Sequence, residues 1–225
     1  MEERTCALRQ KSEALNRMST GIADLLGNVV ESRDVSSGLH ERRVRHLTRI
    51  LATRVMEKCP GYGLTEEIIE SMTLASALHD VGKIAIPDTV LLKPAALTAE
   101  EFELMKTHCE RGCVLLASME GYWDPDYLKM SMEICRYHHE RWDGRGYPEG
   151  LAGDDIPIGA QIVSVVDAYD ALTSERVYKN ALPHEEAAEM ILTGKCGVFS
   201  GILLECFTDS LEDFKKLTER NHNEA

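Results

Sequence analysis

The sequence predicts an all-α protein, and three observations support this prediction. Apolar residues recur at helical spacing along most of the 225 residues, several segments start with residues typical of helix N-termini, and alternating apolar–polar runs are hard to find. The exception is a segment near residues 136–158, where a small β-hairpin would fit.

The first element is one long amphipathic helix over residues 1–30. Four apolar residues follow each other at seven-residue spacing and two more take the offset positions: Leu8, Leu15, Ile22 and Val29, then Met18 and Leu25. Such a seam is typical of a dimerising coiled coil, but also of a helix that lies on its own domain, and Lys11 interrupts it. We take residues 1–30 as a lead-in helix and possible homodimerisation segment, and residues 31–225 as one domain.

The next two helices are bounded by clear start and stop signals. Residues 40–57 form a helix rich in Arg and Leu, which ends at Cys59-Pro60-Gly61. Thr65 is the predicted N-cap of a second helix, whose acidic first turn suits the helix dipole. The apolar face of this helix leads the chain directly into His79-Asp80.

The remaining helices follow from capping residues and prolines. Thr98 and Glu101 fit a capping box, and we expect the helix that they open to continue past Leu116 with His108 and Cys109 on one face. Helices also begin at Pro157 and Pro183, and the second of these stops at Gly194. A final amphipathic helix carries apolar residues at helical spacing: Leu203, Phe207, Leu211, Phe214 and Leu217.

Composition and charge restrict the class of function. The net charge is −13, from 25 Lys and Arg against 38 Asp and Glu, which disfavours general electrostatic binding to nucleic acid polymers or anionic lipid. No apolar run approaches the length of a membrane span, and the N-terminus lacks the apolar region of a secretory signal, so we expect a cytoplasmic protein. Seven irregularly spaced cysteines indicate reduced thiols, and we expect Cys109 and Cys113 to be core residues rather than zinc ligands.

Imidazoles and carboxylates gather where apolar segments run into loops. Seven residues are candidate metal ligands on this ground: His40, His79, Asp80, His108, His138, His139 and Asp167. This donor set suits iron, manganese, zinc, nickel or cobalt, and seven ligands exceed the need of one ion. Two ions bridged by a carboxylate are a recurrent arrangement for phosphoester hydrolysis. The alternative for His79-Asp80 is a structural ion pair with Lys83 or with an arginine. We do not expect His46, His184 or His222 to be ligands.

Three stretches, taken together, resemble the HD-GYP branch of the HD phosphohydrolase superfamily. They read LHDVGKIAIPDTVLLKP at 78–94, LTAEEFELMKTH at 97–108 and HHERWDGRGYPEGLAGDDIPIGAQIVSVVDAYDALTSERVYK at 138–179. They contain both signatures of that branch, His79-Asp80 and Gly146-Tyr147-Pro148, and the match runs from about Glu31 to Gly194.

The resemblance implies a fold, a reaction and a set of site residues. It implies an all-α HD-superfamily bundle, here with a lead-in N-terminal helix and extra C-terminal helices, and a two- or three-metal centre with iron or manganese favoured. The seven candidates named above would be the ligands, with Asp80 bridging and Lys83 contacting the scissile phosphate as the second catalytic residue. The further residues that the resemblance implies in substrate binding are Asp170, Arg176 and Lys179. Ser36 stands where some members have a glutamate that helps to hold a third metal, so we expect two metals.

The loop that contains Gly-Tyr-Pro would shape the rim of the site and contact a partner signalling domain. Its expected residues are Asp143, Gly144, Gly146, Tyr147 and Pro148. The expected reaction opens a bacterial cyclic dinucleotide, above all cyclic di-GMP, to the linear dinucleotide, which can be cut again to mononucleotide. Cyclic GMP-AMP as substrate, a cyclic-dinucleotide sensor or interaction module without turnover, and hydrolysis of a mononucleotide or alarmone are the alternatives.

Overall fold

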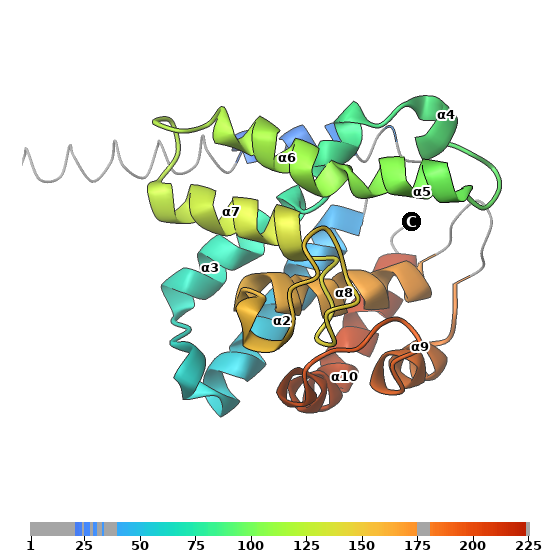
Figure 1. Ribbon diagram of the computed structural model, residues 1–225. Helices are drawn as coiled ribbons and strands as arrows, with labels where there is room; N and C mark the ends of the chain where they lie inside the picture. The colour runs from blue at the N-terminus through green and yellow to red at the C-terminus, as the bar shows by residue number, and fades with distance from the viewer. Residues whose placement is uncertain are drawn as a thin grey trace, which may run out of the picture.

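A computed structural model gives the fold as all-α, as predicted (Figure 1). The structure describes residues 21–23, 25–27, 29–30, 33, 40–174 and 181–223, with side chains up to residue 218. The α-helices in order are α2 (His40–Lys58), α3 (Glu66–Ala75), α4 (Asp88–Leu91), α5 (Ala99–Lys106), α6 (His108–Ala117), α7 (Pro125–Tyr137), α8 (Ile158–Thr173), α9 (His184–Leu192) and α10 (Gly201–Asn223). Short 3-10 segments are η1 (Pro60–Tyr62), η2 (Ser76–Leu78), η3 (Val81–Ala85) and η4 (Gly153–Asp155).

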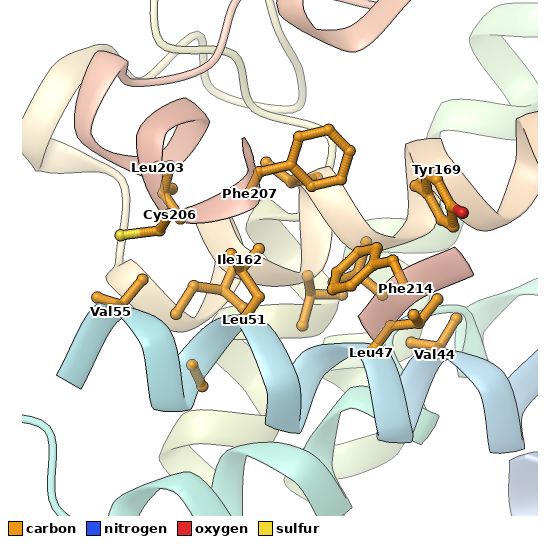
Figure 2. Close-up of a cluster of buried hydrophobic side chains, with 14 of the residues drawn as sticks. Val44, Leu47, Leu51, Val55, Ile162, Tyr169, Leu203, Cys206, Phe207 and Phe214 are labelled. Atoms are coloured by element: carbon orange, nitrogen blue, oxygen red, sulfur yellow. The ribbon is translucent and has the colours of Figure 1, made fainter. Parts of the chain in front are cut away.

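The main hydrophobic core lies between α2, α8 and α10. Figure 2 shows one face of α2, with Leu47 and Leu51, packed against Ile162 of α8 and Phe214 of α10. Helix α8 is buried along most of its length, because its sequence IGAQIVSVVDAYDALT is apolar on nearly every side. A carboxylate on this helix, such as that of Asp167, is therefore carried by the most enclosed element of the domain.

The backbone of η3, next to the His-Asp pair, lies unusually close to the backbone of α6. Helix α3 begins at the predicted cap, where Thr65 accepts a hydrogen bond from the N–H of Ile68 at 3.3 Å, and η2 and η3 flank His79 and Asp80. A Cβ added to Gly82 in η3 would overlap the carbonyl group of His108 at the start of α6. Only glycine allows the two backbones to lie this close.

Two expectations about elements need correction. The helix expected to run from Thr98 past Leu116 is two helices, although its capping box is present as predicted. The break falls at Thr107, whose hydroxyl donates to the carbonyl of Leu104 at 2.6 Å and whose N–H donates to the same carbonyl at 3.1 Å. Within the described residues, the β-hairpin expected near 136–158 is reduced to a single antiparallel bridge between Asp143 and Ala152.

The described part of the lead-in segment packs on the domain. Residues 21–30 are helical where described, and Ala23 and Val30 are buried in a second cluster with Trp123 and Leu128. The opposite face contains Leu25, which is 62% exposed. Leu8, Lys11, Leu15 and Met18 lie outside the described residues, so the dimer stays a prediction. In the described part of the chain, no helix combines the length and the apolar character that a bilayer span requires.

Candidate metal centre

The structure brings all seven predicted ligand residues together in two adjacent groups. One group contains His40, His79 and Asp167, and the other contains Asp80, His108, His138 and His139. Within each group the candidate donor atoms lie within 4.8 Å of one another. They come from α2, from the segment between η2 and η3, from α6, from the end of α7 and from α8.

Asp80 lies between the two groups and faces both. Its Oδ2 atom is 3.3 Å from Nε2 of His79, and its Oδ1 atom is 3.3 Å from Nε2 of His108. One carboxylate therefore presents one oxygen to each group, which is the arrangement that a bridging ligand requires.

Backbone carbonyls at helix ends orient three of the imidazoles. Nδ1 of His79 lies 2.8 Å from the carbonyl of Ser76, Nδ1 of His108 lies 2.8 Å from that of Met105, and Nδ1 of His138 lies 3.1 Å from that of Ile134. Each of these carbonyls lies three or four residues before its histidine, in the helical turn that leads to it. Because a carbonyl only accepts, Nδ1 must donate, and in the neutral ring the lone pair lies on Nε2, which points into the site.

A buried ion pair orients the fourth imidazole. Nδ1 of His40 lies 2.7 Å from Oδ2 of Asp170, which is 1% exposed, and Arg43 donates to both oxygens of the same carboxylate at 2.5 Å and 3.0 Å. Outer partners of this kind fix the tautomer and the direction of a ligand ring. Arg43 was not predicted from the sequence, although its place one helical turn after His40 on the same helix was a usable signal.

Burial and charge shift the ionisation of the two groups in different directions. Burial lowers the pKa of His79, but the nearby carboxylates of Asp80 and Asp167 outweigh it and raise the pKa to about 9. Burial lowers the pKa of His108 to about 4, and burial also lowers the pKa of His139 well below its usual value. Burial would raise the pKa of Asp80, but Lys83 and His79 hold it well below its ordinary range. The centre therefore offers a charged carboxylate at Asp80 beside two imidazoles, those of His108 and His139, whose pKa is lowered.

The donor separations fit divalent transition metals. With metal–nitrogen bonds of about 2.1 Å, two ligand atoms of one ion lie about 3.0 Å apart when the ligand–metal–ligand angle is a right angle. They lie about 4.2 Å apart when the three atoms are in a straight line. In the first group, Oδ1 of Asp167 lies 3.8 Å from Nε2 of His79 and 3.9 Å from Nε2 of His40. In the second group, Nε2 of His138 lies 3.7 Å from Oδ1 of Asp80 and 3.5 Å from Nε2 of His108.

Two donor atoms of the centre are buried without a hydrogen-bond partner. They are Nε2 of His79 and Oδ1 of Asp80, one from each of the two groups. Burying polar atoms unpaired is costly, and metal coordination removes that cost. The residues thus fit a pair of divalent metals on both chemistry and geometry.

The glycine of the Gly-Tyr-Pro motif places an aromatic ring on a ligand. A Cβ at Gly146 would overlap the backbone of Glu140 and Arg141, so the loop folds closely onto the end of the His-His segment. The next residue, Tyr147, donates its N–H to the carbonyl of His139 at 3.3 Å, and the two ring centroids are 4.6 Å apart. The motif loop therefore supports His139 directly.

Glu140 links the two ends of the same loop by hydrogen bonds. Its role was not predicted from the sequence either. Its side chain is buried, and Oε1 accepts hydrogen bonds from the N–H groups of Glu149 at 2.7 Å and Gly150 at 3.0 Å. At the tip, Asp143 accepts from the N–H of Arg145 at 3.2 Å, and Gly144 has a φ of 74°, which favours glycine. Its position next to His139 was the available signal for Glu140.

The remaining predicted site residues have different outcomes. Nζ of Lys83 lies 2.6 Å from Oδ2 of Asp80, at the centre, so the ion pair considered for that stretch coexists with the ligand arrangement. Asp170 uses its carboxylate for His40 and Arg43. Arg176 and Lys179 lie outside the described residues. The substrate contacts expected of all four stay predictions.

Among the described residues, the histidines and cysteines that we did not expect to be ligands belong to neither of the two groups. His46 is exposed on α2, and Nδ1 of His184 lies 2.5 Å from the hydroxyl of Tyr169. The side chain of His222 lies outside the described ones. Cys109 and Cys113 are buried free thiols, as expected of core residues.

Comparison with known proteins agrees with this geometry. The family model described as "HD domain" matches residues 24–195. The chain belongs to the HD domain family. A cyclic di-GMP phosphodiesterase of Vibrio cholerae is 41% identical over 192 residues, which cover 84% of this chain and 39% of the relative. A 3'3'-cGAMP-specific phosphodiesterase 2 of the same organism is 38% identical over 189 residues, which cover 84% of this chain and 34% of that relative.

Solved structures support the HD-GYP fold. An HDG"Y"P protein from Bdellovibrio bacteriovorus matches with a TM-score of 0.61 at 22% identity, over 89% of this chain and 64% of that one. This likeness bears on the fold, and together with the two signatures it confirms the resemblance to the HD-GYP branch. The chain spans less than half the length of either curated relative.

Proposed function

We propose that this HD-domain chain hydrolyses a phosphodiester bond of a cyclic dinucleotide, with cyclic di-GMP as the main substrate. The observation that carries the proposal is the carboxylate of Asp80, which presents one oxygen to each of two ligand groups. Relatives named for cyclic di-GMP and for 3'3'-cGAMP support the substrate class. Cyclic GMP-AMP is therefore the second substrate to test.

The proposed cofactor is a pair of divalent transition metals, iron or manganese first, with zinc, nickel and cobalt also compatible with the donor set. When bound, such a pair supplies Lewis-acid polarisation of the phosphoryl group and an activated water. The ligands would be His40, His79 and Asp167 on one side, His108, His138 and His139 on the other, and Asp80 between them.

The side chains of the protein would bind and orient the substrate. Lys83 would contact the scissile phosphate and stabilise negative charge that develops on it. Its ion pair with Asp80 supports this role. Arg176 and Lys179 are proposed to hold the phosphate groups. Asp170 would act together with Arg43 by holding His40 in the direction that its ligand role requires.

Two surfaces are proposed for partners. The exposed face of the lead-in helix, which contains Ile22 and Leu25, would pair with a second copy of the chain, since both residues belong to the heptad seam. The motif loop would contact a signalling domain through its exposed tip at Arg145.

Metal analysis of anaerobically purified protein, joined to assays with cyclic di-GMP and cyclic GMP-AMP, tests the proposal. The double variant His79→Ala, Asp80→Ala should lose both metal and turnover. His46→Ala is the matched control, because this exposed histidine lies outside both ligand groups, and it should keep both. Full turnover in the double variant, or none in the metal-loaded wild type, would contradict the proposal.

A further inference from the structure

A row of aromatic rings leads from the metal centre towards the surface. The ring of Tyr147 lies 4.6 Å from that of His139, and the ring of Phe102 on α5 lies 6.2 Å from that of Tyr147, at 82° to it. These two steps place Phe102 at most about 11 Å from the ring of a candidate ligand. Figure 1 shows α5 beside the junction with α6, which begins at His108.

Phe102 is not required by the hydrophobic core. Phe102 is 45% exposed as a residue, and it belongs to none of the buried clusters in the described part of the chain. Helix α5 is instead held by Leu104 and Met105, which pack against a cluster that contains Ile86. An exposed phenyl ring at this place has an open face.

Lys106 ties this ring to the motif loop. Its Nζ atom lies 5.2 Å from the centroid of Phe102 and 5.6 Å from that of Tyr147, and it donates to Glu103 at 2.6 Å. A cation over two ring faces attracts both, so Lys106 restrains their mutual orientation.

We propose that Phe102 stacks on a purine base of the cyclic dinucleotide, with Tyr147 and Lys106 positioning its ring. The inference rests on the proposed function. A base is joined to its phosphate through one ribose, so a dinucleotide whose phosphate is at the metal centre carries its bases towards the surrounding rim. Tyr147 is partly covered by His139 and Phe102, which leaves Phe102 as the ring with an exposed face.

The size of the effect follows from base stacking on aromatic side chains. Loss of such a ring typically weakens binding by about 1–3 kcal/mol per base, which is about 5- to 150-fold. Phe102→Ala should therefore lower kcat/KM for cyclic di-GMP by about 10- to 100-fold, mainly through KM. Phe102→Trp should restore most of the loss, because indole also stacks.

Two measurements and a control variant separate stacking from a structural role. Turnover of bis(p-nitrophenyl) phosphate should not change in Phe102→Ala, because its rings are joined directly to the phosphate and do not extend one ribose further. A cyclic dinucleotide with 2-aminopurine in place of one base should lose fluorescence on binding to the wild type but not to Phe102→Ala. Tyr122→Ala, which removes an aromatic ring that is 83% exposed, is the control and should change none of these values.

The outcomes distinguish this inference from the function on which it rests. Equal KM values for cyclic di-GMP in wild type and Phe102→Ala, with normal turnover in both, overturn the stacking role alone. Equal losses for cyclic di-GMP and for bis(p-nitrophenyl) phosphate also overturn it, since they indicate a damaged centre. A wild type that cleaves bis(p-nitrophenyl) phosphate but no cyclic dinucleotide overturns both proposals.

Discussion

Replacing Gly82 with alanine should separate the two backbones on which the metal centre depends. The added Cβ would overlap the carbonyl oxygen of His108, lie 2.8 Å from its carbonyl carbon and lie 2.5 Å from the backbone nitrogen of Gly112. All three atoms belong to the backbone of α6, so no side-chain rotation relieves the overlap. The segment that carries Asp80 must therefore move away from α6 by about 1 Å, since non-bonded carbon atoms prefer separations of about 3.5–4.0 Å.

This displacement has two consequences of different kinds. Overpacking of this type typically lowers the free energy of unfolding by about 1–3 kcal/mol. The distance of 3.3 Å between Asp80 and Nε2 of His108 would increase as well, and a misplacement of about 1 Å in a catalytic site can reduce activity by about 100-fold. We expect Gly82→Ala to lower the midpoint of urea unfolding, weaken metal retention and reduce phosphodiesterase activity.

Gly61→Ala is the matched control for this variant. Gly61 does not have a positive φ, and a Cβ there would meet no atom within 4 Å. The control should keep its stability, metal content and activity. The reasoning is refuted if Gly82→Ala unfolds at the same urea concentration as Gly61→Ala and retains metal equally well.

Three further variants test other parts of the structure. Asp170→Asn should weaken metal binding by about 10- to 100-fold in a chelator competition, because His40 and Arg43 lose their shared anion; unchanged affinity would contradict the orienting role. Thr98→Ala should lower the free energy of unfolding by about 1 kcal/mol through loss of the capping box, whereas Thr98→Ser should not, and equal midpoints for the two would count against the cap. Leu25→Glu should halve the mass in sedimentation equilibrium without lowering the melting temperature. Val114→Glu, on the exposed surface of α6, is the control and should leave the mass unchanged. A monomeric wild type would exclude the dimer.

The sequence was sufficient for most of the longer helices, although not for α7, and for a set of candidate ligands that the structure brings together. Capping signals at Thr65 and Thr98 marked helix starts correctly, because the hydrogen bonds of a cap are local. The seven candidate ligands were chosen from residue types that are rarely buried unpaired, supported by the resemblance to a known family. Their division into two groups around Asp80 required the fold, since His40 and Asp167 are far apart in the chain.

Other features could not be predicted because they depend on tertiary contacts. The break at Thr107 arises from hydrogen bonds to Leu104 inside a segment whose apolar pattern continues without interruption. The roles of Arg43 and Glu140 depend on partners in distant or folded-back segments, Asp170 and the backbone at 149–150. The exposure of Phe102 and its contact with Tyr147 also depend on the fold and have no signal in the sequence.

Anomalous diffraction from crystals of anaerobically purified protein tests the central claim most directly. The account predicts two peaks, one among His40, His79 and Asp167 and one among His108, His138 and His139, with the carboxylate of Asp80 bonded to both. No peak within bonding distance of these side chains, or a single ion that leaves Asp80 uncoordinated, would contradict it.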